Sequence, residues 1–203
     1  MYRVYGDMLS GNCYKIKLLM QFLEIEHEWR HVDILAGETH TDDFVSMNSN
    51  AKIPVLRIDE TNYLSESNAI LNFLAEGTRF LPEGGLHRAR VLQWQFFEQY
   101  SHEPYIAVAR FIQKFLGMPA ERAEEFQSKQ TGGYRALEIM EGQLSKTPFV
   151  AGQSPTIADI SLYAYTHVAH EGGFDLNAFG GIQEWLSRIE ALPNYVVMAR
   201  ENG

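Results

Sequence analysis

A short polar interruption, Ser10-Gly11-Asn12-Cys13, lies between an apolar start and an amphipathic run and brings a hydroxyl, an amide and a thiol together. A cysteine in the first turn of a helix has a lowered pKa and can react, although a buried, unreactive cysteine is the commoner case. Cys13 is the only cysteine of the chain, so the partner of a C-x-x-C pair is missing. Ser10 has no nearby histidine in the sequence and is a poor nucleophile, so we expect it to donate a hydrogen bond.

Two further motifs raise the question of ligand binding, Lys52-Ile53-Pro54-Val55 and Glu66-Ser67-Asn68-Ala69-Ile70. The second stands where a strand meets a helix, and a helix N-terminus offers unpaired N–H groups and the positive end of a dipole to an anion. Ser67 can equally be only an N-cap. Pro54 can simply protect a sheet edge, since only about one X-Pro bond in twenty is cis in folded proteins. Neither motif decides the function alone.

The segment His27-Glu28-Trp29-Arg30-His31 matches the H-E-x-x-H pattern of zinc proteases, which works only on a helix. A helix continued through it would need polar residues on its apolar face, whereas the alternation around Val32 and Ile34 favours a strand. On a strand the two histidines lie roughly 13 Å apart, too far to share a zinc ion. We therefore predict an exposed edge strand and no metal site. His167 and His170 are predicted to lie on a polar helix face.

The hydrophobic period of the first half predicts the strands and helices that carry these motifs. Apolar residues 2–5 predict a strand, a helical spacing runs from Ile16 to Leu23, and residues 44–47 fit a short helix. The stretches "IPVLRI" and "TNYL" predict two strands, and a helical period resumes at Ile70. This βαβαββα order, with strands too short to stand alone, predicts a small sheet covered by helices.

The second half has a different rhythm, which begins after the Gly- and Pro-rich segment "EGTRFLPEGGLHR". We predict a first domain at 1–78, a linker at 79–86 and an all-helical domain at 87–203. One long helical region is expected from Val91 to Leu116, and another around residues 137–144. Thr156 and Asp159 form a capping box with Asp in place of Glu, which predicts a buried helix start.

Composition narrows the class of protein. The chain has 203 residues, 45% of them hydrophobic, which suffices for a sizeable core. A net charge of -9 and the lack of a Lys/Arg run argue against nucleic acid as a partner. The apolar runs are far shorter than the roughly 20 residues that a membrane span needs. One cysteine and an N-terminus without a secretory signal favour a cytoplasmic protein that does not act on membranes.

The motifs, in this order and spacing, resemble the glutathione transferase family over essentially the whole chain. The matching features are Ser10 after the first strand, "KIPVL" before the third, "ESNAI" at the third helix, the Pro/Gly linker, and "SPTIADISLYAY" in the helical half. The resemblance implies an α/β thioredoxin-like N-terminal domain followed by an all-α C-terminal domain. It also implies glutathione as cosubstrate, without a metal.

Residue roles follow from the resemblance for the glutathione site. Ile53-Pro54 looks like the family's cis-proline turn, in which the residue before the proline pairs its backbone with the cysteinyl part of glutathione. Glu66 and Ser67 look like the pair that holds the γ-glutamyl end, with Glu66 meeting the ammonium and Ser67 meeting the α-carboxylate. Lys52 and His40 are the implied neighbours of the glycyl carboxylate.

Ser10 falls where theta-like classes of the family have their catalytic serine, which implies a hydroxyl that stabilises the glutathione thiolate. A thiol of pKa near 8.5 is only about 3% ionised at pH 7, and lowering that pKa by two units takes roughly 2.7 kcal/mol. The "SGN" stretch also lines up with the Thr-Pro-Asn pattern of nu-class members, except that Gly11 replaces the proline. That alignment would give Asn12 a share in the sulfur contact. Cys13 lies about one helical turn too late to match the cysteine of beta or omega classes, so we expect it to pack.

The resemblance implies a pocket for the electrophile between the first strand's end and the first long helix of the second domain. Its candidate lining residues are Met8, Leu9, Tyr105, Ala109 and Ile112. An apolar lining suits an apolar electrophile. Tyr105 and Arg110 are candidates for polarising a leaving group, or else packing and surface residues.

Three functions are compatible with these residues. The leading one is a detoxifying glutathione S-transferase, which adds the glutathione thiolate to a small electrophile. A glutathione-dependent disulfide reductase or peroxidase of nu-class type is the enzymatic alternative favoured by Asn12. The third is a non-catalytic interaction module, for which a disrupted glutathione site would be the sign. Family members are usually homodimers, and Trp94, Phe96 and Phe97 are candidates for the dimer surface or for the core.

Overall fold

The computed structural model describes residues 1–199, and its internal contacts divide the chain into two units. The first unit combines Met1–Glu76 with the segment from Leu192, and the second is Gly77–Ala191. The C-terminal segment is held within the first unit because the Tyr14 hydroxyl donates to the Val196 carbonyl at 2.7 Å. The sequence had predicted that this segment belongs to the helical domain at 87–203. The predicted limits of the two domains and the linker, 1–78, 79–86 and 87–203, stay a prediction.

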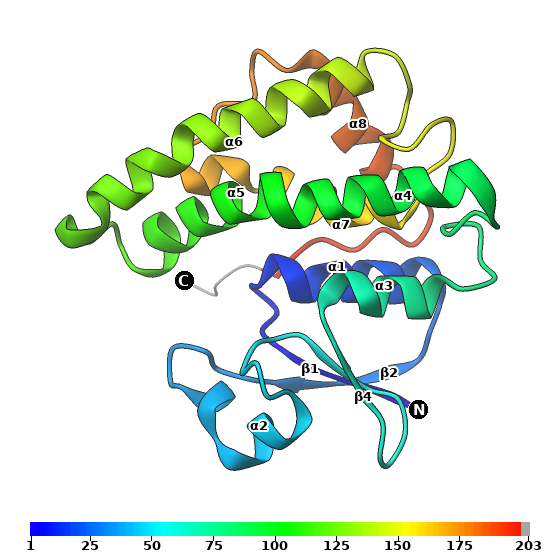
Figure 1. Cartoon of the computed structure of the whole chain (residues 1–203), viewed down its shortest axis with the longest axis vertical. Helices are drawn as coiled ribbons and strands as arrows, with labels where there is room; N and C mark the ends of the chain where they lie inside the picture. The colour runs from blue at the N-terminus through cyan, green and yellow to red at the C-terminus, as the bar shows by residue number, and fades with distance from the viewer. Residues whose placement is uncertain (200–203) are drawn as a thin grey trace. The chain divides into compact units, whose positions relative to one another are not determined.

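The first unit has the predicted βαβαββα order (Figure 1). Its elements are β1 (Tyr2–Gly6), α1 (Gly11–Phe22), β2 (His27–His31), α2 (Asp42–Met47), β3 (Val55–Arg57), β4 (Tyr63–Ser65) and α3 (Ser67–Ala75). The four strands form one sheet in the order β2-β1-β3-β4, in which β1 pairs parallel to β2 and the other two pairs are antiparallel. The thioredoxin-like prediction is confirmed.

The two faces of this sheet bury different side chains, because successive residues of a strand point to opposite faces. Tyr5 and Val55 are cross-strand partners, and they pack with Phe44 of α2 on one face. Val4 and Leu56, the next pair of the same ladder, are fully buried on the other face. Figure 1 shows α1 and α3 side by side on that face. The sheet therefore holds the starts of α1 and α3 in a fixed relation.

The position of β2 corrects one detail of the prediction. The strand comprises His27–His31 and ends before Val32, whereas the alternation had pointed to Val32 and Ile34. The Asp33 carboxylate accepts the N–H groups of Leu35 and Ala36 at 2.8 and 3.0 Å, so the chain turns there instead of continuing as a strand. The H-E-x-x-H segment does form an edge strand of the sheet, as predicted.

The second unit is helical. Its α-helices are α4 (Gly85–Phe97), α5 (Glu103–Arg110), α6 (Ala123–Leu144), α7 (Ile157–Thr166) and α8 (Gly180–Glu190). The π-helical turn Glu98–His102 joins α4 to α5, and a second π-helical turn, Phe111–Phe115, extends α5. This continuous helical run was predicted from Val91 to Leu116, but it begins at Gly85, inside the predicted linker. Short 3-10 turns occur at Ala120–Arg122 and Ala169–Gly172. Within residues 1–199, no helix is both long and apolar enough to cross a membrane.

The predicted capping box begins α7. The Thr156 hydroxyl accepts the N–H of Ala158 at 3.2 Å, and the Asp159 carboxylate accepts the Thr156 N–H at 2.8 Å. Asp159 is fully buried and also accepts from the Val150 N–H and the Trp185 indole. Burial raises the pKa of Asp159, while these hydrogen bonds oppose that rise. This helix start organises the core of the second unit.

Candidate functional site

Strand register brings three predicted motifs to one edge of the sheet. Tyr5 of β1 pairs with Val55 of β3, and Val55 pairs with Ser65 of β4. Since both pairs are antiparallel, the turn after β1, the Ile53-Pro54 dipeptide and the Glu66-Ser67 dipeptide continue from the same edge. Residues about 60 positions apart in the sequence thus face one region of the first unit.

Ser10 is the N-cap of α1. Its hydroxyl oxygen accepts the N–H of Cys13 at 3.4 Å, and its backbone is extended, as an N-cap requires. A hydroxyl has one hydrogen and two lone pairs, so this cap bond occupies only a lone pair. The hydrogen of a half-buried Ser10 can therefore be donated to a ligand at the positive end of the α1 dipole.

Cys13 belongs to the core, as predicted. Its side chain is fully buried, and burial raises the pKa of its thiol to about 12 even though the Ser10 hydrogen bond opposes the rise. The sulfur lies against Gly6, where an added Cβ would approach Sγ to 2.5 Å. A thiol of such high pKa is hardly ionised at neutral pH and is a weak nucleophile.

The start of α3 has an unusual backbone. Glu66 has φ of 66°, a left-handed conformation that is uncommon for residues other than glycine, and its side chain is exposed and makes no cap bond. Ser67, the next residue, is buried with 5% exposure. Non-glycine residues held at positive φ concentrate at ligand clamps, because the surroundings must compensate for the strain. The geometry thus favours a ligand-binding role for this helix start.

A short network connects the starts of the two helices. The Ser67 hydroxyl donates to Asn12 Oδ1 at 3.3 Å and accepts a hydrogen bond from Lys15 Nζ, also at 3.3 Å. Asn12 was a predicted site residue, but Lys15 was not. The available signal was its position: Lys15 stands at helical spacing among the buried residues of α1, Gly11, Leu18 and Leu19. A lysine on the buried face of a helix is rare enough to be noted.

The loop before β3 has the predicted proline geometry. The Ile53-Pro54 peptide bond is cis, and Pro54 is buried. Asn48, which sequence analysis missed, holds this loop: its side-chain Nδ2 donates to the Lys52 carbonyl at 2.7 Å, and its Oδ1 accepts the N–H of Asn50 at 3.1 Å. A C-terminal Asn on a short helix gives little sequence signal for such a role.

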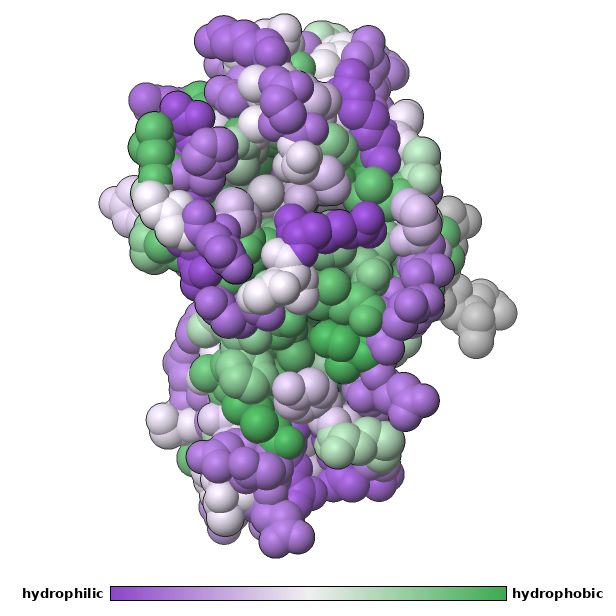
Figure 2. All heavy atoms as spheres, turned by 90° about the vertical axis from the view of Figure 1, so that its right-hand side faces the viewer, coloured by the Kyte–Doolittle hydropathy of each residue, from purple (hydrophilic) through white to green (hydrophobic). Residues whose placement is uncertain are grey.

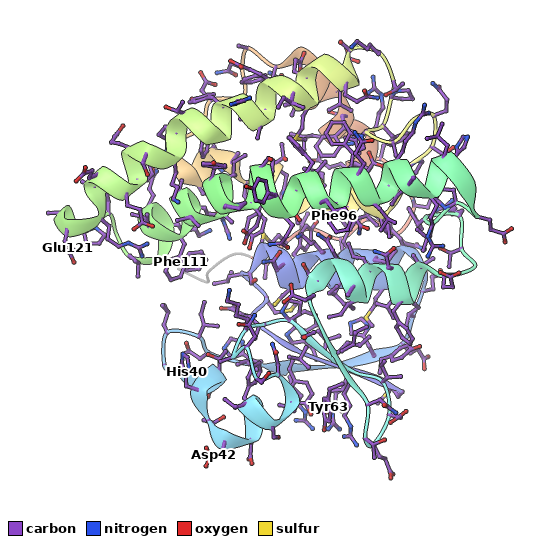
Figure 3. The ribbon with its side chains drawn as sticks, in the orientation of Figure 1. His40, Asp42, Tyr63, Phe96, Phe111 and Glu121 are labelled. Atoms are coloured by element: carbon purple, nitrogen blue, oxygen red, sulfur yellow. The ribbon has the colours of Figure 1, made fainter. Side chains whose placement is uncertain are left out.

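The candidates for the glycyl end lie on either side of α2. His40 ends the 3-10 turn Glu38–His40 just before α2 (Figure 3), and Lys52 follows α2 in the loop that Asn48 holds. Both side chains are exposed. They are accessible cations or donors on the surface of an acidic protein, which suits a carboxylate.

The predicted pocket residues belong to different units. Met8 and Leu9 are half-buried in the turn between β1 and α1, where the Leu9 N–H donates to the Asp7 carboxylate at 2.8 Å. Tyr105 lies in α5 of the second unit. It lines a groove of about 630 Å³ between the π-helical turn Glu98–His102 and α6. Its ring packs over Gly132, where an added Cβ would lie 2.2 Å from the ring. Only glycine allows this contact.

Three other residues considered for the pocket are buried. Ala109 and Ile112 have no exposed surface, which favours a packing role over a lining role. Arg110 is also buried, and its Nε donates to the Glu171 carboxylate at 2.6 Å. The expectation that Arg110 polarises a leaving group is therefore not supported, because its charge is used in an ion pair within the second unit.

The candidates for a dimer surface differ in exposure. Phe96 of α4 is 70% exposed, while Trp94 and Phe97 are half-buried and stack edge to face with ring centroids 5.2 Å apart. Tyr100, close to Phe96, is 85% exposed. Figure 2 shows a face of the molecule on which hydrophobic side chains gather between hydrophilic ones. Exposed aromatic residues of this size are typical of interaction surfaces.

Comparisons with known proteins agree with this architecture. A glutathione S-transferase N-terminal domain model matches residues 9–76, and a glutathione S-transferase C-terminal domain model matches residues 95–193. A glutathione S-transferase crystal structure from Pseudomonas fluorescens is 58% identical, covers 98% of this chain and 99% of its own, and has a TM-score of 0.96.

Two further relatives bear on the chemistry. The disulfide-bond oxidoreductase YfcG of Escherichia coli is 27% identical over 91% of this chain and 88% of its own. A second Pseudomonas fluorescens family member, crystallised with two glutathione bound, is 22% identical, covers 95% of this chain and 89% of its own, and has a TM-score of 0.83, which shows the shared fold.

The fold thus defines a protein with a thioredoxin-like domain followed by a helical domain, and the candidate site residues lie at one edge of the sheet. The chain belongs to the glutathione S-transferase family. The family binds glutathione, and its members include transferases and related glutathione-dependent enzymes.

Proposed function

We propose that this protein is a glutathione S-transferase that activates the thiol of glutathione for attack on a small electrophile. The observation that carries the proposal is the convergence of the Ser10 cap, the Ile53-Pro54 turn and the Glu66-Ser67 helix start at one sheet edge. Each offers a different group to an anionic tripeptide: a hydroxyl, a backbone edge and a helix N-terminus.

Each of these residues binds a different part of the tripeptide. Glu66 receives the γ-glutamyl ammonium, and Ser67 with the α3 N-terminus receives the α-carboxylate. The Ile53 backbone pairs with the cysteinyl unit, while Lys52 and His40 face the glycyl carboxylate. In these assignments the exposed Glu66 carboxylate and the buried Ser67 hydroxyl match the opposite charges of the two groups at one end of glutathione.

Ser10 stabilises the thiolate. The bound thiol loses its proton to solvent, and the sulfur anion accepts the Ser10 hydrogen at the positive end of the α1 dipole. The sulfur then forms a bond to the electrophilic carbon, and the leaving group departs with its electron pair. Met8 and Leu9, half-buried in the turn before α1, contribute apolar surface to the binding of the electrophile, and we infer its apolar class from these two side chains.

Disulfide reduction is the second candidate, because Asn12 lies at the start of α1 and is bonded to Ser67. In that reaction the glutathione sulfur attacks one sulfur of a mixed disulfide and releases the other as a thiolate. The two activities are separated by comparing the turnover of an aromatic halide with that of a mixed disulfide, in the wild type and in Ser10→Ala and Asn12→Ala variants. Loss of only the disulfide activity in Asn12→Ala would favour the reductase.

We also propose a cytoplasmic homodimer that acts in detoxification. The cytoplasm keeps glutathione reduced, which the thiolate chemistry needs. The exposed Phe96 and Tyr100 supply the apolar area for association of two copies. Sedimentation of the wild type beside a Phe96→Glu/Tyr100→Glu variant tests the dimer, which the variant should dissociate.

The deciding experiment is a calorimetric titration of glutathione into the protein, beside a Glu66→Ala/Ser67→Ala variant. We expect saturable binding of one glutathione per chain in the wild type and its loss in the variant. The exposed acid Glu60, changed to Ala, is a matched control that should bind normally. No detectable binding at millimolar glutathione would overturn the proposal and favour a non-catalytic interaction module.

A further inference from the structure

Lys15 has a buried ammonium group that the proposed reaction does not use. Its side chain has no exposed surface, although lysine is almost never fully buried in proteins unless it is paired. Moving an ammonium group out of water is costly, so a position that retains one has to compensate for the cost. Lys15 directs Nζ to Ser67, the buried residue at the start of α3.

The direction of the hydrogen bonds shows which part of the Ser67 hydroxyl Lys15 occupies. An ammonium group can only donate, so Lys15 binds the Ser67 oxygen through a lone pair and leaves the Ser67 hydrogen to another acceptor. That acceptor is Asn12 Oδ1 in this structure. Because a hydroxyl hydrogen rotates about its C–O bond, a carboxylate arriving at α3 can take the hydrogen from Asn12 while Lys15 keeps the oxygen in place.

The charge of the protein also favours a role for Lys15 in binding an anion. The protein carries a net charge of -9, which opposes the approach of an anionic ligand. A cation placed one hydroxyl group behind the α3 N-terminus adds to the positive end of the helix dipole at this point. Being buried, it is screened by salt much less than a surface lysine would be.

We propose that Lys15 is a positioning residue for the ligand carboxylate. It fixes the Ser67 oxygen and supplies positive charge behind the α3 N-terminus, so that the site selects a tripeptide with a carboxylate at its γ-glutamyl end. This inference rests on the proposed glutathione site, and it assigns a role to a residue of α1 that does not itself touch the ligand.

The test compares two ligands in a calorimetric titration. One is glutathione, and the other is γ-aminobutyryl-cysteinyl-glycine, which is glutathione without its α-carboxylate. We expect Lys15→Met to weaken glutathione binding about tenfold or more, the effect of losing a hydrogen bond to a charged group, and to change the binding of the second ligand less than about twofold. Lys15→Arg, which keeps a charged donor, should restore most of the glutathione affinity.

Kinetics provide a readout that a loss of packing would not produce. KM for glutathione should rise in Lys15→Met, while kcat at saturating glutathione and its pH profile should stay as in the wild type. Lys17→Met is the matched control, because Lys17 is the next lysine of α1 and lies half-buried. It should leave both affinities unchanged.

Three outcomes would overturn the inference. In the first, Lys15→Met binds glutathione as tightly as the wild type. In the second, it weakens both ligands equally, which would mean a structural role. If Lys15→Met does not fold, Lys15→Gln replaces it, because glutamine keeps an N–H donor without the charge. The third outcome is that Lys15→Gln prefers glutathione over the second ligand as strongly as the wild type does. A wild type that binds neither ligand would instead overturn the proposed function, and this inference with it.

Discussion

The starts of α7 and α3 contain similar residues and serve different purposes. At α7, Thr156 and Asp159 are buried, and the Asp159 carboxylate accepts hydrogen bonds from two backbone N–H groups and from Trp185. At α3, Glu66 is exposed at positive φ and makes no cap bond, and Ser67 exchanges hydrogen bonds with two side chains. One helix start satisfies its own backbone, and the other is the one that we propose binds a ligand.

The two helix starts differ in whether the N-cap side chain bonds their backbone N–H groups. A terminus whose donors are satisfied by its own capping box has little left for a ligand and contributes to stability. A terminus that is held open by a strained residue loses that contribution but keeps its N–H groups for an anion. Changes at Thr156 and Asp159 should therefore appear in the free energy of unfolding, and changes at Ser10 and Ser67 in binding and turnover.

The largest effect is expected from Asp159→Ala. The change leaves the Val150 and Thr156 N–H groups and the Trp185 indole buried without their acceptor, so the free energy of unfolding should fall by about 3 kcal/mol or more. Urea unfolding measures it, with the exposed Asp175→Ala as the control. A loss below about 1 kcal/mol would mean that the capping box does not set the stability of this region.

At the other end of α7, His167 makes stability depend on pH. Burial lowers its pKa to about 4, while its Nδ1 bonds the Tyr163 carbonyl at 2.8 Å. The histidine of the unfolded chain has a pKa near 6.5 and therefore binds a proton more readily than the folded one. The stability that neutral His167 contributes is complete above about pH 6.5 and is lost as the pH falls toward 4. The loss is up to about 3 kcal/mol.

The measurement for His167 is the free energy of unfolding from pH 7.5 to 4, beside His167→Gln. The variant should show a flatter dependence, since glutamine does not titrate. Equal slopes in the two proteins would assign the pH dependence to other groups.

Ser10→Ala should lower turnover more than glutathione affinity. Loss of the hydroxyl donor is expected to raise the pKa of the bound thiol by up to about two units, or about 2.7 kcal/mol, and to lower turnover at neutral pH by about tenfold. The pH profile of kcat and the ultraviolet absorbance of the thiolate both report this pKa. Should neither move, Asn12 or a backbone N–H would be the better candidate for the sulfur contact.

The smallest effect belongs to Cys13→Ala. The side chain is buried against Gly6 and its thiol has a pKa of about 12, so we expect a loss of about 1 kcal/mol in stability and no change in turnover of halide or disulfide substrates. A variant that lost only disulfide turnover would show that Cys13 takes part in thiol exchange after all.

Much of the fold was predictable because its signals are local. The helical spacing of Ile16 to Leu23 and the Thr156 capping box each act over a few residues, and the corresponding helices formed as expected. The prediction was wrong at Val32 and Ile34, where Asp33 formed a turn that the alternation did not reveal. The C-terminal segment was assigned by a long-range contact of Tyr14, for which no local signal exists.

The order of residues along the chain defines which chemical groups are present and at what spacing: a serine before a helix, a proline before a strand, and an acid and serine before another helix. Which of these groups meet, and which are buried, depends on how the chain folds. Strand register placed Tyr5, Val55 and Ser65 side by side, burial raised the pKa of Cys13, and helix packing directed Lys15 to Ser67. Burial and long-range pairing depend on residues far apart in the chain, so a local pattern cannot encode them.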